Sequence, residues 1–134
     1  MKEIERRFKM KYLPTVTACE KIEQGYIFKG GGSYLRVRIV NQEEGSICFK
    51  HFNSASDRDE FEYIVPLEDA KQMMLLSKSK VSKNRFQTLD KNVVIDVFEN
   101  GLSVVEVENQ VDIPDYCGEE VTELREYSNL FIAK

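Results

Sequence analysis

Apolar and polar residues alternate with a period of two through much of this chain, and such alternation is typical of half-buried β-strands. Turns rich in glycine or asparagine separate many of the alternating segments, as at residues 30–33 (Gly-Gly-Gly-Ser). The pair Asn100-Gly101 suits a type I′ hairpin turn. The pattern predicts strands at residues 2–9, 21–28, 34–41, 46–51, 59–65, 85–88, 93–99 and 103–109.

Residues 66–76 interrupt the alternation and predict a helix. Pro66 suits the first helical position, and Leu67, Ala70 and Met74 fall on one helical face. The fold class we expect is therefore mainly β (α+β), with a few covering helices. Shorter helical stretches are expected to begin at Pro14 and to occupy part of residues 119–132.

Length and composition describe a small globular protein. The 134 residues fit one domain, residues 1–134, because two halves would be too small for separate cores. The formal net charge of −4 argues against nucleic-acid binding, which usually needs a basic face. No apolar run is long enough to cross a bilayer, and the charged residues that follow Met1 do not resemble a signal peptide. We therefore expect a cytoplasmic protein with neither a nucleic-acid nor a membrane partner.

Cysteine and histidine are too few to form the usual soft-metal sites. The three cysteines lie far apart, and His51 is the single histidine, which argues against both a disulfide framework and a zinc site. Any metal ion would be held mainly by carboxylates, and such ligands favour magnesium, manganese or calcium.

Charge is concentrated on one face of most predicted strands, opposite an apolar face. Neighbouring charges on a face often share a sign, as in Glu3 with Glu5 and Arg36 with Arg38. Acidic and basic strands are also largely separate. The positions concerned are Glu3, Glu5, Arg7, Arg36, Arg38, Lys50, Glu60, Glu62, Lys83, Arg85, Asp96, Glu106 and Glu108.

Two arrangements would account for these faces. In the simpler one, two sheets bury their apolar faces against each other and leave the charges in water. However, a face selected only for solubility would intersperse the signs, because like charges two residues apart repel. In the second arrangement the sheet closes with the charges inward and forms a polar tunnel. Charges inside such a tunnel must be paired, hydrated or bound to metal.

The motifs resemble those of the CYTH superfamily, the triphosphate tunnel metalloenzymes. Residues 3–7 (Glu-Ile-Glu-Arg-Arg) are similar to the E-x-E-x-K signature near the N-terminus of that family. One such motif alone would be weak, but several follow in the family's order and cover nearly the whole chain. These are residues 22–26 (Ile-Glu-Gln-Gly-Tyr), 35–38 (Leu-Arg-Val-Arg), Lys50, 60–63 (Glu-Phe-Glu-Tyr), 96–98 (Asp-Val-Phe), 106–108 (Glu-Val-Glu) and 127–130 (Tyr-Ser-Asn-Leu).

The resemblance implies a closed eight-stranded antiparallel β-barrel that hydrolyses inorganic triphosphate, thiamine triphosphate or the triphosphate end of RNA, or that cyclises ATP. It implies Mg²⁺ or Mn²⁺ as cofactor and a small-molecule triphosphate as substrate. The implied metal ligands are Glu3, Glu5, Glu106 and Glu108, assisted by Glu60 and Glu62. The implied substrate-binding residues are Arg36, Arg38, Lys50 and Arg85, with Lys83, and the implied catalytic residues are Glu5, Arg7 and Glu106.

Two departures from the family pattern keep other functions open. Arg7 replaces the usual lysine and cannot act as a base, and Ile64 stands where many relatives have a third acidic or polar residue. The expected function is metal-dependent hydrolysis of inorganic triphosphate or a small organic triphosphate, because a chain this short has few loops to recognise a base. The alternatives are a non-catalytic triphosphate-binding module and an adenylyl cyclase. Apolar outer faces also suggest a homodimer.

Overall fold

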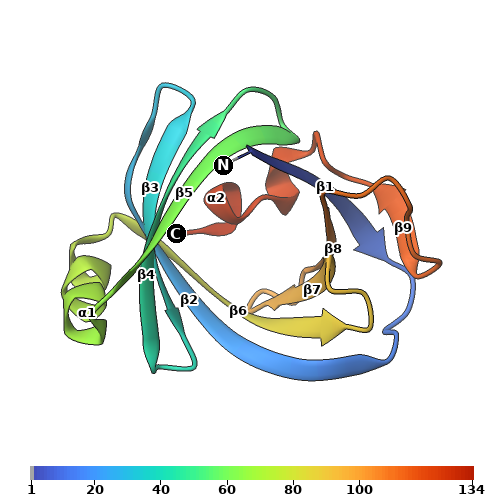
Figure 1. Ribbon diagram of the computed structural model, residues 1–134, viewed down its shortest axis with the longest axis horizontal. Helices are drawn as coiled ribbons and strands as arrows, with labels where there is room; N and C mark the ends of the chain where they lie inside the picture. Colours follow the sequence, from blue (N-terminus) through green and yellow to red (C-terminus); the bar gives the residue numbers. More distant parts are fainter. Residues whose placement is uncertain (1) are drawn as a thin grey trace.

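Nine antiparallel strands make up most of the computed structural model, which describes residues 2–134 (Figure 1). A single helix of ten residues, α1 (Leu67–Leu76), follows the fifth strand. A 3₁₀ turn, η1 (Arg125–Tyr127), and a short helix, α2 (Asn129–Ile132), end the chain. The strands are β1 (Lys2–Met10), β2 (Val16–Gly30), β3 (Ser33–Val40), β4 (Glu44–Phe52), β5 (Asp57–Val65), β6 (Ser79–Thr88), β7 (Val93–Phe98), β8 (Ser103–Glu108) and β9 (Cys117–Glu120).

Eight of these strands close into a barrel, as predicted. The strand order is β5-β4-β3-β2-β6-β7-β8-β1-β9, and β1 also pairs with β5, which joins the two sides of the sheet. The closing register is short, with Lys2, Glu3 and Ile4 opposite Asp59, Arg58 and Asp57. β9 is an additional strand that pairs with β1 further along, at Phe8 and Met10.

Three local predictions were wrong. The chain around Pro14 is not helical, because β2 begins at Val16. β6 begins at Ser79, six residues before the predicted start; the early part was missed because residues 79–84 (Ser-Lys-Val-Ser-Lys-Asn) contain a single apolar residue and so show no apolar–polar alternation. Asn100-Gly101 does not form a type I′ turn, which needs positive φ at two residues. Only Gly101 has positive φ (88°), and its N–H bonds the Phe98 carbonyl, as in a three-residue hairpin loop.

The outside of the barrel carries two apolar clusters. α1 covers β2, β3 and β4 on one side (Figure 1), where Val37 and Ile39 pack against Ala70. The predicted helical face is confirmed, since Leu67 and Met74 join this cluster. On the opposite side, β1, β7 and β8 form the second cluster, whose members are Phe8, Val93, Ile95, Val105, Val107 and Cys117.

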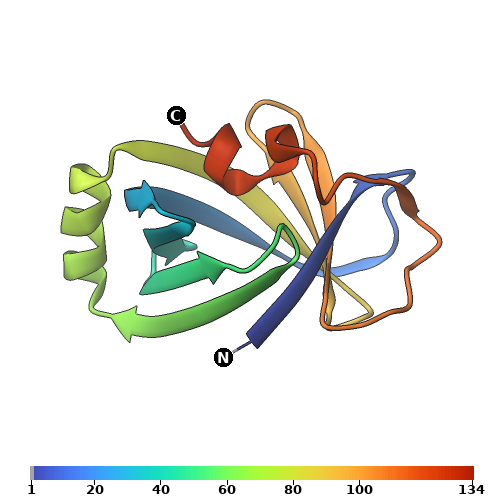
Figure 2. The same cartoon turned by 90° about the horizontal axis from the view of Figure 1, so that it is seen from above.

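A third apolar cluster lies inside one end of the barrel. Figure 2 shows η1 and α2 lying across that end. Tyr26, Tyr34 and Phe98 contribute from the strands, and Leu130 and Ala133 pack onto them from the C-terminal segment. The last residue, Lys134, exchanges two backbone hydrogen bonds of 2.8 Å with Lys80 of β6. The barrel interior is therefore apolar at the closed end and charged beyond it. Among residues 2–134, no helix combines the length and hydropathy that crossing a membrane requires.

Candidate functional site

A chamber of about 210 Å³ occupies the charged part of the barrel interior. It is lined entirely by polar and charged side chains from six strands and from the first residue of α2. The alternation of the strands produces this wall, because every second residue points inward. The lining residues are Glu3, Glu5, Tyr34, Arg36, Arg38, Lys50, Arg58, Glu60, Glu62, Arg85, Glu106, Glu108 and Asn129. We call this cavity the tunnel chamber.

The acidic wall of the tunnel chamber comes from β1 and β8. These neighbouring strands place Glu5 directly opposite Glu108. Carboxylate oxygens of Glu3, Glu5 and Glu108 lie within 4.8 Å of one another. The Glu3 Oε1 atom is buried, with Lys50 Nζ at 3.0 Å and Arg58 Nε at 3.6 Å, but neither contact has hydrogen-bonding geometry. A hard divalent cation suits such a set of carboxylate oxygens, so the residues present fit the metal that the resemblance implies.

A second group of possible ligands comes from β4 and β5. The register of β4 and β5 places Cys48 opposite Glu62, and Glu60 is next to them on the same face. Ile64 continues this face of β5, but it is 91% exposed and does not line the chamber. An acidic residue at that position would therefore lie outside the cavity.

The basic wall comes from β3, β4 and β6. Lys50 Nζ lies 3.0 Å from Glu3 Oε1 and 3.3 Å from Glu60 Oε2. The Arg38 guanidinium donates two hydrogen bonds to Gln24 Oε1, at 3.0 and 2.6 Å. Arg36 has no close carboxylate: its Nε is buried without a partner, and its Nη2 is 3.9 Å from Glu62. Arg36 and Arg38 are thus available to an anion in the chamber.

Burial and neighbouring charges separate the pKa values of the acidic side chains. Burial alone would raise the pKa of Glu5, but Arg58, Lys50 and Arg7 lower it to about 2. Burial raises the pKa of Glu106, and the negative charges of Glu5 and Asp96 raise it further. Burial and a hydrogen bond with Glu60 raise the pKa of Glu3 to about 8. Glu5 is therefore ionised, whereas the raised pKa of Glu3 favours its protonated form, hydrogen-bonded to Glu60, whose own pKa is lowered.

Two basic residues of the predicted site do not face the tunnel chamber. Lys83 Nζ is completely buried and donates to Asp96 Oδ2 at 2.6 Å and to Asn129 Oδ1 at 2.7 Å. Asp96 also receives two hydrogen bonds from Arg85, at 2.8 and 2.9 Å. Lys83 therefore supports Arg85, which does line the chamber, through their common carboxylate. Arg7 lines an adjoining cavity instead.

Sequence reasoning missed three residues of the chamber wall: Arg58, Tyr34 and Asn129. Arg58 donates to Glu5 at 2.7 Å and shares an inward face of β5 with Glu60 and Glu62. Arg58 falls just outside the predicted strand, which begins at residue 59. Its two-residue spacing from Glu60 was the available signal. Asn129 carries no such signal, because its place depends on how the C-terminal segment enters the barrel.

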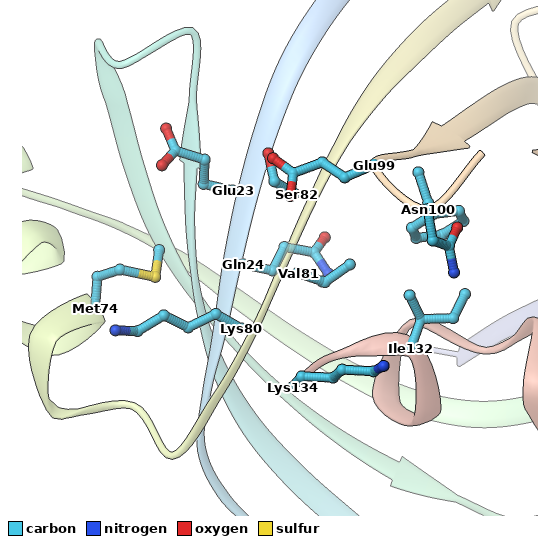
Figure 3. Close-up of a pocket in the computed structure, with 11 residues that line it drawn as sticks. Glu23, Gln24, Met74, Lys80, Val81, Ser82, Glu99, Asn100, Ile132 and Lys134 are labelled. Carbon is cyan, nitrogen blue, oxygen red and sulfur yellow. The ribbon is translucent and has the colours of Figure 1, made fainter. Parts of the chain in front are cut away.

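A further hollow, of about 320 Å³, lies between the C-terminal end of α1, β6 and the end of the chain (Figure 3). Its cationic side chains, Lys80 and Lys134, point in opposite directions (Figure 3) and do not converge on a common anion. Met74, Val81 and Ile132 supply much of the remaining wall. This hollow lacks the convergent charges of the tunnel chamber.

The fold and the chamber together define a class: a closed antiparallel β-tunnel with acidic and basic inner walls. A model of the CYTH domain matches residues 1–133. The chain therefore belongs to the CYTH family.

Solved structures agree with this assignment. The chain is similar to the inorganic triphosphatase NE1496, with 26% identity over 98% of this chain and 93% of that one, and a TM-score of 0.65. It also shares its fold with a conserved hypothetical protein from Pyrococcus furiosus, at 20% identity over 86% of this chain and 83% of that one, with a TM-score of 0.63. No curated protein matches the chain at a significant level.

Proposed function

We propose that this protein hydrolyses inorganic triphosphate or a small organic triphosphate in the tunnel chamber, with Mg²⁺ or Mn²⁺ as cofactor. The observation that carries the proposal is one cavity lined by both carboxylates and guanidinium and ammonium groups. Carboxylates suit divalent cations, and guanidinium groups bind phosphate oxygens in a bidentate fork. The similarity to a triphosphatase supports this choice of substrate.

In the reaction, a water oxygen bonds to a terminal phosphorus of triphosphate and the P–O bond to the bridging oxygen breaks. The products are orthophosphate, pyrophosphate and one proton. When bound, Mg²⁺ or Mn²⁺ would supply positive charge against the phosphates and Lewis acidity that activates water. Glu3, Glu5 and Glu108 would hold the ion, while Arg36, Arg38, Lys50 and Arg85 orient the phosphates. The raised pKa of Glu106 suits it to take up the proton that water loses.

Phosphate release with a panel of triphosphates and divalent metals tests the proposal. Inorganic triphosphate, thiamine triphosphate and ATP would each be assayed with magnesium, manganese and calcium. We expect Glu5→Gln to abolish metal-dependent release and Arg38→Ala to slow it about 10²–10³-fold. Arg6→Ala is the matched control, because Arg6 lies on the outer face of β1 and pairs with Glu120. Circular dichroism would verify that each variant is folded.

Arg7 favours one alternative, a tunnel that binds triphosphate without hydrolysing it. Its guanidinium cannot accept a proton, and it donates to the Thr122 carbonyl at 2.6 Å rather than facing the tunnel chamber. In that case triphosphate would raise the melting temperature, but no phosphate would be released with any of the metals.

A further inference from the structure

A second chamber, of about 200 Å³, adjoins the tunnel chamber at the end closed by the C-terminal segment. We call it the side chamber. The two cavities have four wall residues in common: Glu5, Tyr34, Arg58 and Asn129. The exposed side chain of Arg125 also lines the side chamber, so this cavity reaches from the charged interior to the protein surface.

Arg7 is a buried cation of the side chamber without a close counter-ion. It is 6% exposed, and its Nε atom is buried with no hydrogen-bond partner. Its nearest carboxylate oxygen, Glu5 Oε1, lies 3.7 Å from Nη1 and already accepts from Arg58 at 2.7 Å. The remaining contact of Arg7 is the neutral carbonyl of Thr122. A buried charge needs closer compensation than this, so the site lacks an anion.

The other charged residues of the side chamber and its volume indicate which kind of anion it could bind. Arg58 also lines the side chamber, although it pairs with Glu5 at 2.7 Å and its Nε lies 3.6 Å from Glu3 Oε1, and Arg125 adds a third guanidinium. Opposing them in the lining are two carboxylates, Glu5 and Glu123. With this guanidinium-rich lining, a cavity of about 200 Å³ suits a small oxyanion such as orthophosphate.

We propose that the side chamber binds orthophosphate while the tunnel chamber still holds the rest of the substrate. This inference rests on the proposed function, because triphosphate hydrolysis would form orthophosphate beside the common wall of Glu5 and Arg58. Arg7 and Arg125 bind its oxygens, as guanidinium groups do. Orthophosphate then leaves past Arg125, and pyrophosphate leaves from the tunnel chamber.

Calorimetric titration with orthophosphate tests this inference. The full chain with Mg²⁺ is titrated with and without saturating diimidotriphosphate, whose bridging nitrogens resist hydrolysis. We expect one orthophosphate to bind when diimidotriphosphate fills the tunnel chamber, and at least one to bind without it. Arg125→Ala and Arg7→Gln should each weaken orthophosphate binding at least about tenfold, the usual effect of losing a charged hydrogen bond. Arg125→Ala should leave diimidotriphosphate binding unchanged.

Lys71→Ala is the matched control, because Lys71 is an exposed cation on α1 that lines neither cavity. If diimidotriphosphate displaces orthophosphate, or if Arg125→Ala binds it like the wild type, the side chamber is not a separate site. Because Arg125 is exposed, Arg125→Ala should fold normally. It therefore tests whether the side chamber is a separate orthophosphate site even if Arg7→Gln fails to fold. Both readouts are binding measurements, so an absence of triphosphate hydrolysis would refute the proposed function without refuting the side chamber.

Discussion

At the scale of single residues, the spacing of charged residues along a strand predicted which side chains face the barrel interior better than the sign of their charge did. The two-residue spacing in Arg36 and Arg38, and in Glu106 and Glu108, predicted one inward face correctly, and all four line the tunnel chamber. Spacing could not show that Lys83 would donate its hydrogen bonds to Asp96 and Asn129 instead of lining the tunnel chamber. Ion pairs across strands depend on register and on distant segments, which a single strand's pattern does not contain.

The buried carboxylate of Asp96 should be a main source of stability. It has no exposed surface and serves both Lys83 and Arg85. Asp96→Asn would leave these cations without their counter-ion, and we expect the free energy of unfolding to fall by about 3–5 kcal/mol. Urea denaturation measures the change. Asp57→Asn is the control, because Asp57 pairs with Lys2 on the surface and should cost under about 1 kcal/mol. Equal effects in the two variants would contradict the prediction.

The raised pKa of Glu3 predicts a pH dependence of stability. Its pKa rises from the ordinary 4.5 to about 8 on folding, so between these values the folded protein binds a proton that the unfolded chain has released. Stability without metal should therefore fall as the pH rises through this interval. Magnesium should restore stability most at the upper end, because the cation displaces the proton.

Urea unfolding at several pH values, with magnesium or with a chelator, measures both effects. Glu3→Gln has no carboxyl to titrate, so its stability should depend less on pH than that of the wild type. An unchanged slope in Glu3→Gln would show that Glu3 is not the titrating group.

At the scale of elements, alternation located most strands, while long-range packing determined the rest. β9 was not predicted. Part of residues 119–132 is helical as expected, in η1 and α2, but the sequence pattern could not show that this segment packs into one end of the barrel. β9 exists because β1 has an edge that β5 covers only as far as Ile4. α2 has four residues and depends on the apolar cluster inside the barrel.

The contact between α1 and β4 requires a residue without a side chain at position 45. A Cβ atom on Gly45 would lie 2.5 Å from the Cβ of Ala70. We expect Gly45→Ala to lower the free energy of unfolding by about 1–3 kcal/mol, because the helix must move away from the sheet. The rate of triphosphate hydrolysis below the melting temperature should change little, since α1 lies outside the barrel.

A second substitution tests this explanation. Ala70→Gly should recover part of the stability lost in Gly45→Ala, despite its cost of about 1 kcal/mol in helix propensity. If the double variant loses as much free energy of unfolding as the two single variants together, or more, steric contact between the two residues is not the cause.

At the scale of the whole molecule, the uncovered part of the outer surface predicts self-association. Four apolar side chains align across β2, β3, β4 and β5: Phe28, Leu35, Phe49 and Phe61. Phe28 is 55% exposed and Phe61 45%. Contiguous apolar patches of this kind often form interfaces. We expect a homodimer, and light scattering on the eluted protein would measure its mass.

Phe49→Ser combined with Phe61→Ser should shift the mass to that of a monomer. Leu89→Ser is a suitable control, because Leu89 is exposed outside the aligned row. A wild-type chain that remains monomeric at high micromolar concentration would exclude the homodimer.

The pairing of β9 with β1 has a consequence for solubility. Closing the barrel leaves the second half of β1 without a neighbour on one side, and β9 occupies that side at Phe8 and Met10. Without β9, the unpaired N–H and C=O groups of β1 would be free to recruit a strand from another molecule. This four-residue strand therefore protects the edge of β1 from intermolecular pairing. Substitutions that weaken β9 should cause aggregation, amorphous or fibrous, before they disturb the charged interior.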